Sequence, residues 1–156
     1  MTCFRLFAPL LLIVGLVGCG PDVHQEQDNG VRTIESPLPY DVYRARLIVA
    51  INDNGLHIVD GACGKCSVKT IDVPLEDSEI LSLYGPDLTL RMMQAGAAAG
   101  SGAPLRFYLT RIETGGVRLT YHLPSHALAI FDAPDLKPLA EELDRTFARI
   151  VAATDR

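Results

Sequence analysis

The second half of the chain contains a sequence pattern typical of a β-hairpin. Two runs rich in strand-favouring residues, 105–112 and 117–123, flank the turn sequence Glu-Thr-Gly-Gly at 113–116. A short glycine-containing turn between two such runs is typical of a hairpin, which pairs its strands antiparallel. The chain is therefore expected to contain an antiparallel sheet.

Two amphipathic stretches predict long helices. The first is expected to begin at Ser36, as an N-cap, with Pro37 at the first helical position. Its end is expected at Asn54 and Gly55, because glycine suits a left-handed cap. The second helix is expected to begin at Asp135. Residues three and four apart form an apolar stripe on each helix: Tyr40, Tyr43, Leu47 and Ile51 on the first, and Leu136, Leu139, Leu143, Phe147 and Ile150 on the second.

Shorter patterns complete the expected order of elements. Apolar or β-favouring runs predict further strands at 31–35, 56–59, 68–73 and 80–84, the second of them buried. A short helix is expected at 88–94, and a loop in the small, glycine-rich segment 95–103. The sequence thus predicts one α+β domain, an antiparallel sheet with two main helices packed on one face.

Several short motifs follow one another in a characteristic order. They are Ser36-Pro37 before the first helix, Asn54-Gly55-Leu56 before a strand, Tyr84-Gly85-Pro86-Asp87-Leu88 running on to Met92-Met93-Gln94, Ala103-Pro104-Leu105-Arg106, and the strand 117–121 followed by Pro124. This order, with the final amphipathic helix, resembles the domain-of-unknown-function 302 family over residues 32–153. The Cys-bearing segment 61–67 departs from the family's pattern. The resemblance implies a small α+β domain, a sheet available for self-association and no settled enzymatic activity.

Residues 1–18 have the pattern of a secretory signal peptide. Arg5 precedes an apolar stretch at 6–17 that is too short for a comfortable membrane span. The stretch ends in Leu16-Val17-Gly18-Cys19, which resembles the lipobox of bacterial lipoproteins. That resemblance implies cleavage before Cys19 and attachment of acyl chains such as palmitate there, which would anchor the mature protein in a bilayer.

The sequence after the signal peptide divides into a tether and a domain. Residues 19–31 are polar, contain proline and glycine, and are expected to be a flexible tether behind the lipidated Cys19. Residues 32–156 are expected to form the single domain. Gly20 stands where aspartate would signal retention in the inner membrane. We therefore expect the protein in the bacterial cell envelope, on the outer membrane and facing the periplasm.

The composition excludes several classes of protein. The formal net charge is −5 and there is no tryptophan, which argues against nucleic-acid binding. Hydrophobic residues make up 48% of the chain, which argues against a disordered protein. Beyond the N-terminal segment, no apolar run is long enough for a membrane span.

The pair Cys63 and Cys66 leaves three interpretations open. The oxidising envelope favours a disulfide that closes a loop through a tight turn. A redox-active dithiol is the second interpretation, with Lys65 lowering the pKa of a thiol. However, the strand-favouring residues 67–71 differ from the helix that begins at thioredoxin-like pairs. The third is a zinc or copper site that combines this pair with His122 and His126, which have metal-ligand spacing, or with His57.

The sequence contains no pattern of a hydrolase, P-loop or dinucleotide site. The acidic cluster Glu76, Asp77 and Glu79 is expected to be a solvated turn, and Met92-Met93 to be core. We therefore expect a lipid-anchored envelope protein that is not an enzyme and uses no cofactor. Its domain would bind itself or an envelope protein partner. The alternative is a thiol-redox or metal-handling protein that uses Cys63 and Cys66.

Overall fold

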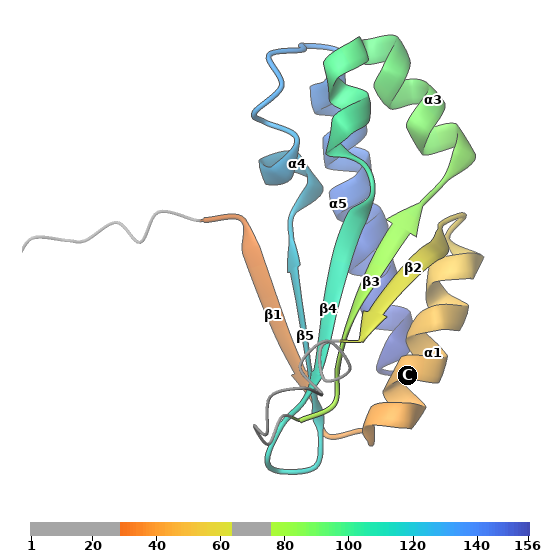
Figure 1. The fold of residues 1–156 in the computed structure, drawn as a ribbon, viewed down its shortest axis with the longest axis vertical. Coiled ribbons are helices and arrows are strands. Elements are labelled where there is room, and N and C mark those ends of the chain that lie inside the picture. The colour runs from red at the N-terminus through yellow and green to blue at the C-terminus, as the bar shows by residue number, and fades with distance from the viewer. Residues whose placement is uncertain (1–28, 64–75) are drawn as a thin grey trace, which may run out of the picture.

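The computed structural model describes residues 29–63 and 76–156. Five antiparallel strands form one sheet in the order β1-β5-β4-β3-β2 (Figure 1). The strands are β1 (Val31–Ser36), β2 (His57–Cys63), β3 (Ser78–Tyr84), β4 (Leu105–Arg111) and β5 (Val117–His122). The predicted hairpin is confirmed as β4 and β5, whose register pairs Arg111 with Val117 across the turn.

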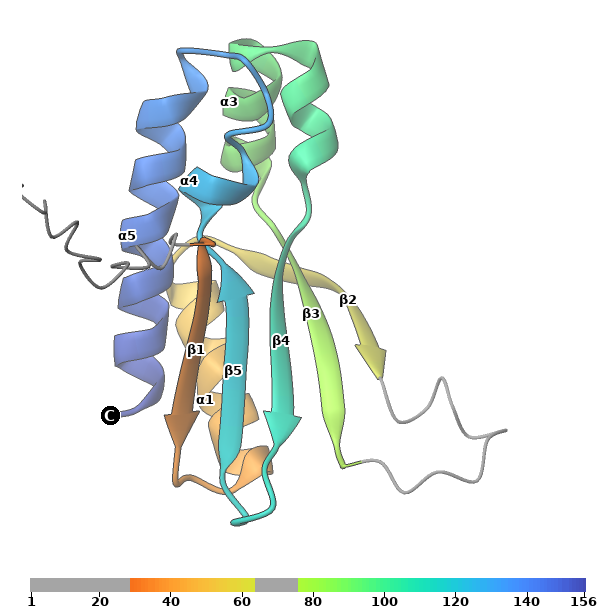
Figure 2. The ribbon, with the colours of Figure 1, turned by 90° about the vertical axis from the view of Figure 1, so that its left-hand side faces the viewer.

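Two long helices, α1 (Tyr40–Asp53) and α5 (Leu136–Thr154), cover one face of the sheet. In Figure 2, α1 lies behind the strands and α5 stands beside β1, and the sheet with its helices confirms the predicted α+β fold. The Arg149 side chain of α5 donates a hydrogen bond to Asn54 at the end of α1, 3.3 Å away. All nine residues of the two predicted apolar stripes are buried.

Three shorter elements lie beyond one end of the sheet, at the top of Figure 1. They are α3 (Pro86–Ala95), the 3-10 helix η1 (Ala97–Gly102) and the single turn α4 (Pro124–Ala127). The chain passes from β3 into α3 and η1 before it returns in β4, and it passes from β5 through α4 to α5. This end is built from connections between strands and helices, and the largest cavity described below lies here.

The core lies between the sheet and the two long helices. Phe107 of β4, Tyr121 of β5 and Phe147 of α5 meet edge to face, with ring centroids 4.6–5.5 Å apart. This geometry is favourable because the positive edge of one ring meets the negative face of the next. The other sheet face carries polar pairs, such as Arg118 with Glu35 and Thr33 with Thr120.

The predicted start of the first helix is wrong. Ser36 is the last residue of β1, where it pairs with Val117, and the helix begins at Tyr40. The reason is Pro39, because the residue before a proline is driven into extended conformation and Leu38 therefore cannot be helical. The predicted end is confirmed, with Gly55 at a φ of 74°.

Two other predictions for this part of the fold need correction. The strand expected to be buried near 56–59 is an edge strand, β2, in which the Val59 side chain is 57% exposed. The segment 95–103 is not all loop, because η1 occupies most of it and buries Ala99. Alanine favours helix strongly enough to form these turns between the glycines. The strand expected at 68–73 lies outside the described residues.

Candidate functional site

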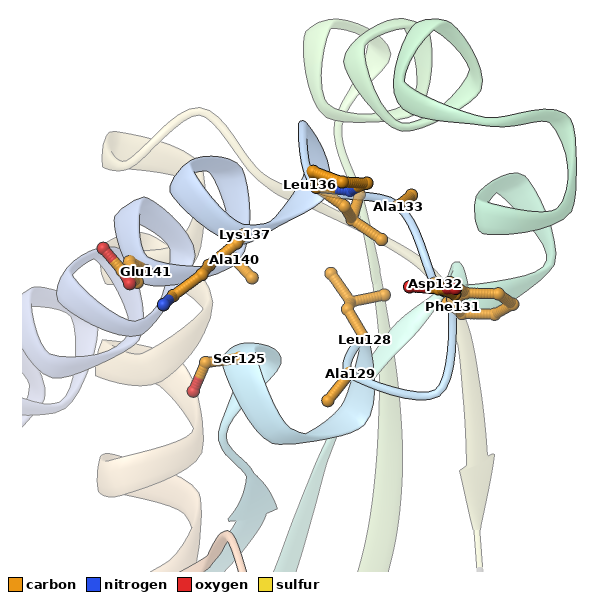
Figure 3. A pocket seen from close by; sticks show the side chains of 11 residues that line it. Ser125, Leu128, Ala129, Phe131, Asp132, Ala133, Leu136, Lys137, Ala140 and Glu141 are labelled. Atoms are coloured by element: carbon orange, nitrogen blue, oxygen red, sulfur yellow. The ribbon is translucent and has the colours of Figure 1, made fainter.

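A cavity of about 590 Å³ lies among the described residues. It lies between α4, the connecting segment 128–135 and the first turns of α5 (Figure 3). Eleven residues line it: Ser125, Leu128, Ala129, Phe131, Asp132, Ala133, Pro134, Leu136, Lys137, Ala140 and Glu141. Its size is within the range of small-molecule sites.

Successive tight turns shape the wall of this cavity. Pro124 is the first residue of α4, a position at which an N–H group would have no partner within the helix. The Pro124 carbonyl accepts a hydrogen bond from the Leu128 amide at 2.9 Å. The Phe131 amide donates to the Leu128 carbonyl at 3.1 Å, and the Ala133 amide donates to the Phe131 carbonyl at 2.7 Å. The segment thus curls around the space that it encloses before α5 begins.

The 3-10 helix η1 packs closely against two residues that line the cavity, Leu128 and Phe131. A Cβ atom on Gly102 would lie 2.7 Å from Leu128 Cδ2 and 2.8 Å from Phe131 Cε2, closer than real contacts allow. Only glycine therefore lets η1 approach Leu128 and Phe131, two apolar side chains that line the cavity, this closely. The glycine-rich segment has a packing role that its composition alone does not reveal.

The cavity has an apolar floor and a charged rim. Leu128, Leu136 and Ala140 are buried and form the floor. The charged rim residues Asp132, Lys137 and Glu141 are exposed. In Figure 3, Lys137 and Glu141 lie at one end of the cavity and Asp132 at the other, beside Phe131. This arrangement suits a molecule with a hydrophobic body and a polar or charged end.

The start of α5 has few free donors for a ligand. The Leu136 amide donates to the Ala133 carbonyl at 2.9 Å, and the Lys137 amide donates to the Pro134 carbonyl at 3.3 Å. Pro138 has no N–H at all. Helix N-termini bind anions through unpaired N–H groups, and these first-turn positions do not supply them.

Two polar contacts hold the surrounding elements in place. Arg91 of α3 makes a bidentate pair with Glu142 of α5, at 3.1 and 2.7 Å. This hydrogen-bonded pairing lowers the pKa of Glu142 below its ordinary value. The Ser125 amide of α4 donates to the Asp144 carboxylate at 2.9 Å.

A second, smaller cavity of about 420 Å³ lies at the other end of the sheet, where β2 ends. Tyr40, Asp41, Arg44, Cys63, Asp77, Ser78 and Glu79 line it. Arg44 forms a two-bond ion pair with Glu79, one of its hydrogen bonds being 2.9 Å long. Arg111 pairs with Asp77 at 2.8 Å and lies over the Tyr40 ring, 5.2 Å from its centroid.

These pairs correct the expectation of a solvated acidic turn for Asp77 and Glu79, whereas Glu76 is exposed as expected. Asp77 and Glu79 are half-buried and ion-paired. Burial, with the neighbouring Glu79 charge, raises the pKa of Tyr40 to about 12, because both disfavour the phenolate. The expectation for Met92-Met93 holds only for Met92, which is fully buried, whereas Met93 is 59% exposed.

The structure separates the histidines from Cys63. Cys63 on β2 is the register partner of Glu79 and lines a cavity with residues of α1. His122 is exposed on β5, and β4 and β3 lie between β5 and β2. His126 lies in α4 against Gly30, and His57 contacts Asn52 at 3.2 Å. Among the described residues, no three His, Cys, Asp or Glu side chains gather in a way that could hold a metal ion.

Two predicted site residues, Cys19 and Cys66, lie outside the described residues. Lipidation of Cys19 and a disulfide between Cys63 and Cys66 therefore stay predictions. Within the described ranges, no helix combines the length and the hydropathy needed to cross a membrane.

The sequence patterns do not mark the cavity at α4. The turn α4 was not expected, and the apolar residues Leu128 and Phe131 had no helical or strand periodicity to mark them. The one available signal was Pro124 shortly after a strand, which is compatible with the first position of a short helix.

Comparison with known proteins identifies the family. The family model "Domain of unknown function DUF302" matches residues 32–154. A crystal structure of an uncharacterized conserved DUF302 protein from Bacillus stearothermophilus has the same fold, with a TM-score of 0.70 at 15% sequence identity. That match covers 81% of this chain and 96% of the other. No curated protein matches the chain. Since the family model spans most of the sequence, this chain belongs to the DUF302 family.

Proposed function

We propose that this protein is a lipid-anchored, non-enzymatic binding module of the bacterial cell envelope, and that the cavity beside α4 binds a small amphiphilic molecule. The observation that carries the proposal is the cavity itself, about 590 Å³ with an apolar floor and a charged rim. Most binding sites for small molecules combine these two features. Anchoring rests on the lipobox at residues 16–19 and on the polar tether that follows it.

The expected affinity follows from the apolar floor. Each methylene group transferred from water into an apolar site contributes about 0.8 kcal/mol. A ligand that buries about five methylenes among Leu128, Leu136 and Ala140 gains about 4 kcal/mol from transfer, before the cost of association is subtracted. Such a ligand is therefore expected to bind no more tightly than a Kd of about 1 mM. Tighter binding would need a longer chain or a charged head that matches the rim.

The binding test uses 1-octanol as a neutral probe. Backbone hydrogen exchange of the full chain, followed by mass spectrometry, should slow at residues 124–141 as octanol is added. Replacing Ala140 with Leu fills the cavity and should weaken this effect, and Ala129→Leu should do the same from the more exposed wall. Ala148→Leu is the matched control, because Ala148 is exposed on the same helix outside the cavity lining. An octanol response that the two cavity variants leave unchanged, or no response at all, would overturn the proposal.

The anchor has its own test. Cys19→Ser should move the protein from the membrane fraction to the soluble fraction, because it removes the atom that carries the lipid. Cys3→Ser is the matched control, since Cys3 lies in the expected signal peptide but outside the lipobox. Membrane association that survives Cys19→Ser would contradict lipid anchoring at this residue.

A thiol-redox function at Cys63 and Cys66 is the second candidate. Cys63 lines a cavity, which favours access by another molecule. Reactive thiolates occur in electropositive surroundings. The lining here has three carboxylates, on Asp41, Asp77 and Glu79, against the guanidinium of Arg44 and that of Arg111, which pairs with Asp77. We therefore favour a structural disulfide for the pair. The non-reduced mature protein should be lighter than the dithiol form by two hydrogens and should contain no zinc or copper.

A further inference from the structure

We propose that the cavity beside α4 prefers amphiphilic cations, that is, molecules with an aliphatic body and an ammonium head, over anions of the same length. This inference rests on the proposed binding function and adds the charge of the ligand's head. It follows from the charges of the rim, from the hydrogen bonding at the start of α5 and from the acidic residues next to the cavity.

The rim itself carries a net negative charge. Asp132 and Glu141 contribute two carboxylates, and Lys137 is the single cationic residue of the lining. Lys137 and Glu141 stand four residues apart on α5, a spacing at which opposite charges attract each other. Glu141 thus offsets the charge of Lys137. Asp132 remains at the other end of the cavity, beside Phe131 (Figure 3).

The start of α5 does not attract an anion strongly. The positive end of a helix dipole amounts to about half a charge, and Asp135, at the N-cap of α5, carries a full negative charge beside it. The amides of Leu136 and Lys137 already donate to the carbonyls of Ala133 and Pro134. A carboxylate or phosphate would find few unpaired N–H groups there.

A further carboxylate lies next to the cavity. Asp144 accepts the hydrogen bond of the Ser125 amide, and Ser125 lines the cavity from α4. Glu142 is also near but is paired on both oxygens with Arg91, so its charge is largely neutralised. Arg145, four residues after Glu141 on α5, is a further cation near this end of the cavity. The described charges around the cavity are still mainly negative, with Asp132, Asp135, Glu141 and Asp144 against Lys137 and Arg145. This balance complements an ammonium head at the rim with its alkyl chain on the floor.

Three probes of equal chain length distinguish the contribution of the head group to binding from that of the alkyl chain. They are octylammonium, octanoate and 1-octanol. Each is titrated into the full-length protein, and hydrogen exchange at residues 124–141 is measured. We expect half-maximal protection by octylammonium at a concentration at least about threefold lower than by octanoate, a difference typical of partly exposed charges. The difference should shrink at high salt, because salt screens interactions between exposed charges.

Variants assign the preference to the rim. Asp132→Asn and Glu141→Gln should each reduce the ratio between the two charged probes, and Lys137→Gln should increase it. Glu113→Gln is the control, because it removes the same charge at the hairpin turn, away from the cavity. All four are exposed positions, so the folded protein should tolerate the changes.

Each outcome supports or overturns a stated claim. Equal or tighter binding of octanoate, with octanol bound, overturns the cation preference and leaves the binding function standing. The cation preference is also overturned if only Glu113→Gln changes the ratio between the two charged probes, because the rim charges would then not cause the preference. Failure of all three probes overturns the binding function together with this inference.

Discussion

Arg91 and Glu142 join α3 to α5 through two parallel hydrogen bonds, from Nη1 to Oε1 at 3.1 Å and from Nη2 to Oε2 at 2.7 Å. The two residues are far apart in sequence, and their pairing links the short helix beyond the sheet to the long helix on its face. Arg91 lowers the pKa of Glu142 through this hydrogen-bonded contact. Both side chains are partly exposed, so water weakens the attraction.

Glu142→Gln is therefore expected to lower the free energy of unfolding by about 0.5–1 kcal/mol at neutral pH. The pKa of Glu142 is lower in the folded than in the unfolded protein, so the pair stabilises above the unfolded pKa. This contribution disappears as the pH falls through the folded value. Urea unfolding of wild type and variant should thus differ near pH 7 and converge as the pH falls below the ordinary carboxyl range. Glu113→Gln serves as the control, and an equal difference at both ends of this pH range would contradict the expectation.

Gly102→Ala is expected to destabilise the protein by about 1–3 kcal/mol, the usual effect of overpacking. The new methyl group would press against Leu128 and Phe131, which lie within 2.8 Å of its position. Gly100→Ala, in the same 3-10 helix, is the matched control, because its nearest neighbour would be Met93 Cγ at an ordinary 3.5 Å. Thermal unfolding compares the two variants. Equal losses would show that helix propensity, rather than contact with the cavity wall, decides the effect.

Gly30→Ala and Gly55→Ala form a second matched pair. Both glycines have positive φ angles, 71° and 74°, so alanine is strained at either position. At Gly30 the new Cβ would also overlap the His126 side chain, whereas Gly55 has open space around it. We expect Gly30→Ala to cost more stability than Gly55→Ala. The added change His126→Gly, which removes the overlapping Cβ as well as the ring, should restore the excess, and denaturant unfolding of the double variant measures this.

Tyr40 should make folding sensitive to alkali. Its pKa is raised from 10.0 to about 12, first because burial disfavours the phenolate and second because Glu79 lies near. A raised pKa means that the stabilisation is complete below the unfolded value and is lost as the pH rises between 10.0 and about 12. Tyr40→Phe should lose less stability over this window than wild type. Circular dichroism during alkaline unfolding tests this, and identical curves would contradict it.

The sequence was sufficient for elements with a clear repeating pattern. The stripes from Tyr40 to Ile51 and from Leu136 to Ile150 are buried as predicted, because helical periodicity records which side faces the core. The β4–β5 hairpin followed from its turn residues for a similar local reason. The predicted helix start at Ser36 is wrong because the sequence has two prolines, Pro37 and Pro39, that could mark the beginning of a helix. In the structure, Pro39 rather than Pro37 marks this boundary.

The site near α4 is a different case. Leu128, Phe131 and Gly102 carry no periodic signal, and they meet only because β4 and β5 bring the ends of η1 and α4 together. The pairs Arg44–Glu79 and Arg111–Asp77 likewise join segments that are distant in sequence, so an acidic run that looked solvated became half-buried.

Local patterns therefore determined the element types, the α+β class and the family of this protein, since backbone propensity and side-chain period act over a few residues. Tertiary structure alone decided the order of the strands, the edge position of β2 and the cavity with its charged rim. These features depend on contacts between residues far apart in the chain, and such contacts leave no period or spacing in the sequence to be read.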